Sequence, residues 1–146
     1  MTKNKNLWPN GKKIHGSSGK KISKTKLKLE LHALVKQIVL ARDPLCRICG
    51  KRASTTPYHL IPRSFLAVTW DLRNVIGSCV GCNFAEKNNR ILYQQKHREI
   101  FGVQYYDELL SIALAGKKWS MWELQTLRDA LVGGVDMGNS ANGELK

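Results

Sequence analysis

The sequence predicts an α+β fold, with helices on both sides of a short central region that contains two strands. Three observations lead to this prediction. Apolar residues recur at helical spacing before residue 43 and after residue 104, short strand-like pieces lie between residues 45 and 82, and two CxxC pairs bracket these pieces. The chain has 146 residues, of which 42% are hydrophobic, enough for the core of one domain.

Composition sets the expected boundaries of that domain. Residues 1–26 are rich in Lys and contain no acidic residue, so we expect a basic flexible arm there. Such an arm either keeps the protein soluble or adds phosphate contacts. We expect the folded domain over residues 27–132. Residues 133–146 are rich in Gly and Asn, and we expect a flexible C-terminal tail there.

The chain carries a large positive charge. It has 24 Lys and Arg against 11 Asp and Glu, which gives a net charge of +13. This excess favours a polyanionic partner, either nucleic acid or an anionic membrane surface. The membrane is the weaker alternative, because no apolar run approaches the roughly 20 residues that span a bilayer. The first residues lack the apolar run of a signal peptide, so we expect a cytoplasmic protein with reduced thiols.

Residues 27–42, LKLELHALVKQIVLAR, form the first predicted helix. Asp43 and Pro44 end it. His32 lies beside its apolar face, and we interpret this residue as a structural or surface histidine. Six apolar side chains share the face: Leu27, Leu31, Leu34, Val35, Ile38 and Val39.

Three further helices are predicted after the strands. The first covers residues 83–98 and begins directly after Cys82, and the second covers residues 104–116 and ends at Gly116. The third opens with Ser120 and Glu123 at the spacing of a capping box and closes on Gly133. We expect its large apolar side chains in the core: Trp119, Trp122, Leu124, Leu127 and Leu131.

The four cysteines form two pairs, CRIC with Cys46 and Cys49, and CVGC with Cys79 and Cys82. Each pair can turn tightly and present two thiolates, and two such turns complete a tetrahedral zinc site. Four thiolates leave no coordination position for a substrate. The sequence therefore predicts a structural zinc, which ties the first strand region to the start of the following helix.

Between and after the cysteines come His59, Asn74, Asn83 and Glu86. The pattern HxIPRS…W…N…CxxCN resembles the HNH endonucleases, and the resemblance implies a zinc-stapled ββα-metal core with additional helices on both sides. Over roughly residues 30–131 the chain most resembles phage recombination endonucleases of the NinG/Rap type. The stretch CNFAE is also similar to the corresponding stretch of phage endonuclease VII.

This resemblance implies a metal-dependent DNA endonuclease, acting on branched recombination intermediates such as Holliday junctions and D-loops, in the cytoplasm of a phage-infected bacterium. It assigns a catalytic Mg²⁺ or Mn²⁺ to Asn83 and Glu86, and catalytic roles to His59, Asn74 and Glu86. A neutral imidazole can take a proton from water near pH 7, and Asn74 would orient the site. Symmetric cutting of a four-way junction needs two active sites, so a homodimer would fit. We expect four cationic side chains to contact DNA: Arg63, Arg73, Lys87 and Arg90.

One departure from the family leaves a second interpretation open. Many HNH enzymes carry an acidic residue or His directly before the catalytic His, as a metal ligand, and this chain has Tyr58. Water, phosphate oxygens, Glu86 or Asp71 would have to complete the metal site. The alternative is a non-catalytic zinc module that binds nucleic acid, a degenerate HNH fold. A zinc ribbon for protein contacts would explain the cysteines but not the charge.

Overall fold

The structure is a computed structural model that describes the main chain of residues 21–141 and the side chains of residues 21–134. Most of the predicted basic arm therefore lies outside the described residues, as do residues 142–146 of the predicted tail. The described part is α+β, as predicted. Its five helices and two strands are α1 (Lys24–Arg42), β1 (Thr56–His59), β2 (Val75–Ser78), α2 (Val80–Asn88), α3 (Arg90–Phe101), α4 (Val103–Ala115) and α5 (Met121–Ala141).

The first helix is confirmed and begins three residues earlier than expected. The Oγ of Ser23 accepts a hydrogen bond from the main-chain N–H of Lys26 at 3.2 Å, which caps the N-terminus. The helix ends at Asp43, whose N–H bonds to the carbonyl of Val39. Four residues of the predicted apolar face are fully buried: Leu27, Leu31, Val35 and Val39.

The two strands pair antiparallel, with Tyr58 opposite Ile76 and His59 opposite Val75. Side chains alternate between the two faces of a strand. Tyr58 and Ile76 therefore belong to one cluster of buried residues, and Val75 belongs to a second cluster on the other face. The sheet is covered on both faces, which is why every residue of β2 is buried.

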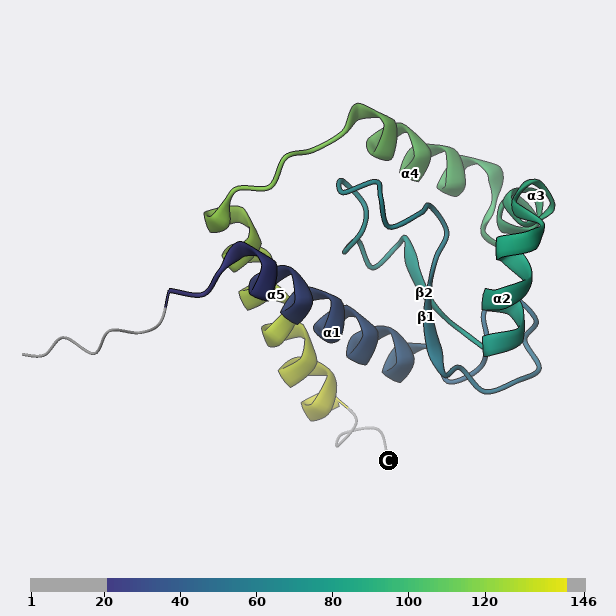
Figure 1. Cartoon of the computed structure of the whole chain (residues 1–146). Coiled ribbons are helices and arrows are strands. Elements are labelled where there is room, and N and C mark those ends of the chain that lie inside the picture. Colours follow the sequence, from purple (N-terminus) through teal and green to yellow (C-terminus); the bar gives the residue numbers. More distant parts are fainter. Residues whose placement is uncertain (1–20, 142–146) are drawn as a thin grey trace, which may run out of the picture.

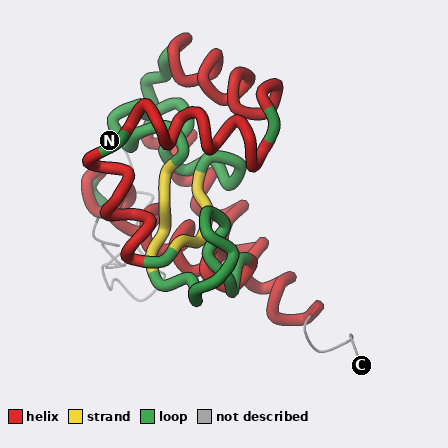
Figure 2. The backbone as a smooth tube through the Cα atoms, turned by 90° about the vertical axis from the view of Figure 1, so that its right-hand side faces the viewer, coloured by secondary structure: helices red, strands yellow, loops and turns green. Residues whose placement is uncertain are grey.

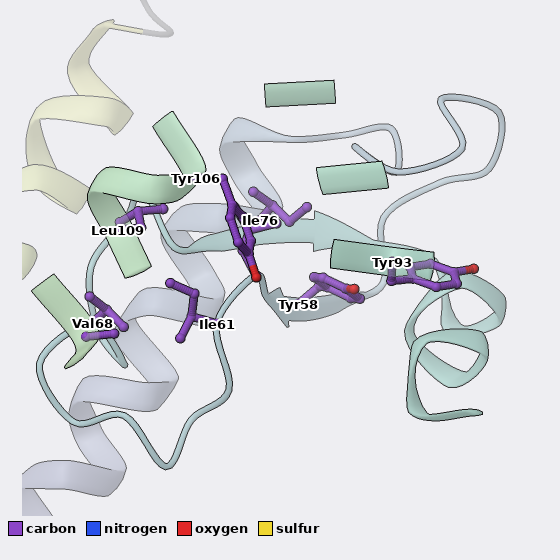
Figure 3. Packing of buried hydrophobic residues seen from close by; sticks show 9 residues of the cluster. Tyr58, Ile61, Val68, Ile76, Tyr93, Tyr106 and Leu109 are labelled. Carbon is purple, nitrogen blue, oxygen red and sulfur yellow. The ribbon is translucent and has the colours of Figure 1, made fainter. Parts of the chain in front are cut away.

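Helices supply both covers. In Figure 1, α1 and α5 cross on one side of the strands, α4 lies on the other side, and α2 and α3 stand beside the sheet. Figure 2 shows the same arrangement from the side, with the two strands at the centre. Figure 3 shows the cluster under α4, in which Tyr58 and Ile76 pack with Tyr106 and Leu109. The cluster under α1 and α5 contains Trp70 and Val75.

A buried carboxylate ties α1 to the second strand. Asp43 is 4% exposed, and its Oδ2 accepts a hydrogen bond of 2.9 Å from the N–H of Gly77. Arg42 pairs with the same carboxylate at 2.7 Å. A side chain at Gly77 would bring its Cβ to 2.8 Å from the Cβ of Asp43, so this close approach requires glycine.

The prediction of one helix over residues 83–98 is wrong in two respects: the helix starts earlier, and the region forms two helices. Cys79 is the N-cap, so α2 begins at Val80 and includes Cys82. The helix then breaks at Asn89, whose φ of −140° and ψ of 53° are not helical, and α3 begins at Arg90. In the first turn of α2 the N–H of Cys82 consequently bonds to the Sγ of Cys79, at 3.4 Å.

The last two helices follow the prediction more closely. α4 ends at Ala115 and is capped by Gly116, which has a φ of 73°. Ser120 and Glu123 form the capping box, with reciprocal bonds of 2.9 and 3.1 Å. The predicted end at Gly133 is wrong, because α5 runs on to Ala141. Trp122 is also not a core residue, since 72% of it is exposed. None of the described helices has the length and apolar character needed to cross a bilayer.

Candidate functional site

The four cysteines come together as predicted. One ligand atom from each of Cys46, Cys49, Cys79 and Cys82 lies within 4.8 Å of all the others. Zn–S bonds of about 2.3 Å in a tetrahedron would put the sulfurs about 3.8 Å apart, so the cluster is compatible with structural zinc. Among the described residues no other group of three or more His, Cys, Asp or Glu is close enough to hold a metal in this way.

Main-chain amides prepare the thiols for a cation. Hydrogen bonds from the N–H groups of Lys51 and Arg52 lower the pKa of Cys49 to about 6. Cys79 caps α2 by accepting the N–H of Cys82 at 3.4 Å, and this bond lowers the pKa of Cys79. Burial and the neighbouring sulfurs raise the pKa of Cys82. Four thiolates this close repel one another, and a divalent cation removes that repulsion.

Two of the three predicted catalytic residues, His59 and Glu86, line a cavity of about 550 Å³ between α1, the strands and α2. His59 of β1 lies in its wall, and Asn83 and Glu86 of α2 line it as well. His59 lies more than 20 positions before Asn83 and Glu86 in the sequence. The pairing of β1 with β2, followed directly by α2, brings them together.

His59 is half-buried and held by one hydrogen bond. Its Nε2 lies 3.0 Å from the main-chain oxygen of Thr69. A carbonyl oxygen can only accept, so Nε2 carries the proton and the neutral ring has its lone pair at Nδ1. Burial lowers the pKa of His59 to about 4, and the positive charge of Arg63 acts in the same direction. The imidazole is therefore neutral at pH 7 and can accept a proton.

Asn74 does not touch the cavity but holds the loop that supports His59. It is fully buried, and its Oδ1 accepts the N–H of Ile61 at 2.8 Å. Its Nδ2 donates to the carbonyls of Ile61 and Val68, at 3.1 and 3.0 Å. These bonds fix the loop one residue before Thr69. Asn74 thus holds this loop in place, and its orienting role in catalysis stays a prediction.

Asn83 and Glu86 line the cavity from one side of α2, since they are three residues apart on the helix. The Nδ2 of Asn83 lies 3.4 Å from the Oγ1 of Thr56, and no described residue bonds to its Oδ1. Glu86 forms no ion pair with any described side chain. An amide oxygen and a carboxylate are ligands that suit Mg²⁺, which keeps several waters and phosphate oxygens around it.

Three of the four predicted DNA contacts surround the same cavity: Arg63, Lys87 and Arg90. The fourth does not. Arg73 makes two side-chain bonds to Asp71, of 3.1 and 2.7 Å, and neither residue lines the cavity. Asp71 is therefore not placed to complete a metal site with Glu86.

Tyr58 points away from the cavity. It is 1% exposed, and its hydroxyl lies 2.7 Å from Nε2 of His97 in the core under α4. Because neighbouring residues of a strand face opposite sides, an acidic residue at position 58 would also face this core. Position 58 therefore supplies no side chain to the cavity, which leaves Asn83 and Glu86 as its oxygen-bearing residues from α2.

Two residues of α1 were not recognised from the sequence. His32 and Lys36 both line the cavity, opposite α2. His32 also packs on Trp70, with 5.4 Å between ring centroids. The spacing within the helix places His32 beside the apolar face but carries no information about what packs there. His32 and His59 line the same cavity only because of the tertiary structure.

Comparisons of the chain with protein-family models, curated proteins and solved structures give no match.

Proposed function

We propose that the protein is a metal-dependent DNA endonuclease of the HNH type, which hydrolyses phosphodiester bonds in branched DNA. The observation that carries the proposal is the cavity. It combines a neutral histidine, two oxygen ligands and several cationic side chains from separate elements. The order β1, β2, α2 is also the order that a ββα-metal core requires.

His59 is the general base of the proposed reaction. Its Nε2 proton stays bonded to the carbonyl of Thr69, so Nδ1 accepts the proton of a water molecule. The water oxygen attacks phosphorus, and the bond between phosphorus and the departing sugar oxygen breaks. A general base of this kind contributes roughly 10²–10⁴ in rate. With a pKa near 4, His59 remains available as a base well below neutral pH.

Asn83 and Glu86 are the candidate ligands of the catalytic metal. A bound Mg²⁺ or Mn²⁺ would supply positive charge for the phosphate and the departing oxygen. Arg63, Lys87 and Arg90 would hold the DNA backbone at the mouth of the cavity. The net charge of +13 favours DNA binding over the remaining surface.

The alternative is a zinc module that binds nucleic acid without cutting it. It accounts for the cysteines and the charge equally well. It gives no reason for a neutral histidine to line the same cavity as an amide side chain and a carboxylate that pairs with no described cation. Activity decides between the two.

A nuclease assay on wild-type protein tests the proposal. The substrates are linear duplex, single strand, flap and four-way junction, each with Mg²⁺, Mn²⁺ or EDTA. We expect cleavage that requires metal and is faster on the branched substrates. Glu86→Gln should lower the rate and regain part of it at high Mn²⁺. The matched control Glu108→Gln, on α4 away from the cavity, should leave the rate unchanged. Binding without metal-dependent cleavage of any substrate would select the non-catalytic module.

A further inference from the structure

His32 is a half-buried histidine of the candidate site that the mechanism above does not use. It comes from α1, whereas the other site residues come from β1 and α2. The cavity therefore has an imidazole on each of two walls, His32 on one and His59 on another. Arg63 lies near both rings, since its charge lowers the pKa of each.

The ring of His32 is held by the same loop that holds His59. Thr69 bonds to His59 through its main-chain oxygen, and the next residue, Trp70, packs against His32. Trp70 is 3% exposed and is itself fixed by Trp119, with 5.7 Å between the ring centroids. One turn of the loop thus sets the positions of both imidazoles.

Both ring nitrogens of His32 are free to meet a ligand. No hydrogen bond to a described residue involves them, and neither nitrogen is sealed from solvent. A histidine that served packing alone would not need to line an open cavity. The surrounding cations, Lys36, Arg63, Lys87 and Arg90, favour an anionic group in the space that His32 faces.

We propose that His32 is a second substrate-contacting histidine, which donates a ring N–H hydrogen bond to a non-bridging oxygen of the scissile phosphodiester. The proposal rests on the proposed function, because it assigns a role at the same site. His59 serves the attacking water from β1, and His32 holds the phosphate from α1. The phosphate is then fixed between the two histidines and the oxygen ligands of α2.

Two substitutions separate this contact from packing. His32→Phe keeps an aromatic ring against Trp70 but removes the donor, whereas His32→Gln keeps an N–H. We expect His32→Phe to retain zinc and its melting temperature and to lose on the order of 10² in single-turnover cleavage, as for one oriented donor. His32→Gln should recover part of the loss. Equal rates for wild type and His32→Phe would overturn the proposal.

Histidine NMR on ¹³C-labelled wild-type protein gives a readout that does not depend on cleavage. On adding an uncleaved DNA oligonucleotide in EDTA, the titration midpoint of His32 should move to higher pH, because a nearby phosphate favours the protonated ring. His97, buried on the other face of the sheet, is the internal control and should not respond. A response of His32 in a protein that never cuts DNA would support the contact while refuting the nuclease. No response in an active nuclease would refute the contact alone.

Discussion

His59 and His97 lie on opposite sides of the same strand and differ in what surrounds them. Burial lowers the pKa of each to about 4. His97 is 1% exposed, its Nε2 lies 2.7 Å from the hydroxyl of Tyr58, and the rings of Tyr93 and Tyr106 are its neighbours. His59 is half-buried in the wall of a cavity that also holds an amide oxygen, a carboxylate and several cations.

The comparison teaches that a lowered pKa does not by itself identify a functional histidine. Both rings are neutral at pH 7, so both could accept a proton, yet of the two only His59 lines an open cavity. The alternation of side chains along β1 produces the difference, because it sends Tyr58 to the core and His59 to the cavity. We assign a structural role to His97 and propose a catalytic one for His59.

Removing the zinc site should affect both histidines at once and have the largest effect. Cys79 caps α2, which carries Asn83, and Cys46 and Cys49 belong to the chain that leads into β1. Structural zinc contributes about 10–16 kcal/mol in small metal-dependent folds, as much as the whole stability of a typical domain. We expect Cys79→Ser to lose zinc, cooperative thermal unfolding and cleavage together.

Elemental analysis and differential scanning calorimetry measure this outcome. Wild-type protein treated with a strong chelator should lose the same transition and regain it when Zn²⁺ is returned. A zinc-free Cys79→Ser protein with an unchanged melting temperature would show that the cysteines do not hold the fold.

A smaller effect is expected in the pH dependence of the free energy of unfolding, to which His59 and His97 should contribute equally. An unfolded histidine titrates near pH 6.5, and each folded one near 4. The folded protein favours the neutral ring of each histidine. The stabilisation of the folded state that results is therefore fully present above pH 6.5. This stabilisation is lost as the pH falls from 6.5 to 4, because in this range the unfolded chain binds more protons than the folded protein. His59→Gln and His97→Gln should each flatten this fall, by at most about 1.4 kcal/mol per pH unit.

Urea unfolding at a series of pH values between 4 and 7 gives these slopes. The two variants serve as controls for each other, because zinc release at low pH is common to both. A slope that flattens for one variant and not the other would mean that the two histidines do not share the same lowered pKa.

Several features could be predicted from the sequence because they depend on local spacing. Two CxxC pairs place four sulfurs together, a run of apolar residues four apart makes α1, and Ser120 with Glu123 begins α5. The order of His59, Asn74 and Asn83 indicated one site; in the structure His59 and Asn83 line one cavity, and Asn74 bonds to the loop next to Thr69.

Other features depend on tertiary contacts that no spacing reveals. His32 enters the cavity only because α1 packs across the strands. α2 begins at Val80, three residues before its expected start, because the thiol of Cys79 accepts a helix amide. The break at Asn89 occurs without Gly or Pro. The sequence also does not show that the side chain of Tyr58 lies on the core face of β1, against His97.

Single-turnover cleavage of a four-way junction at saturating, matched DNA occupancy tests the central claim most directly. Wild type, His59→Gln and His97→Gln are compared at pH 7 with Mg²⁺, after zinc content and folding are verified for each. Gln at position 59 can still donate to the carbonyl of Thr69 but cannot act as a base. We predict a loss of about 10²–10⁴ for His59→Gln and a rate within a few-fold of wild type for His97→Gln. Equal rates for wild type and His59→Gln would contradict the account.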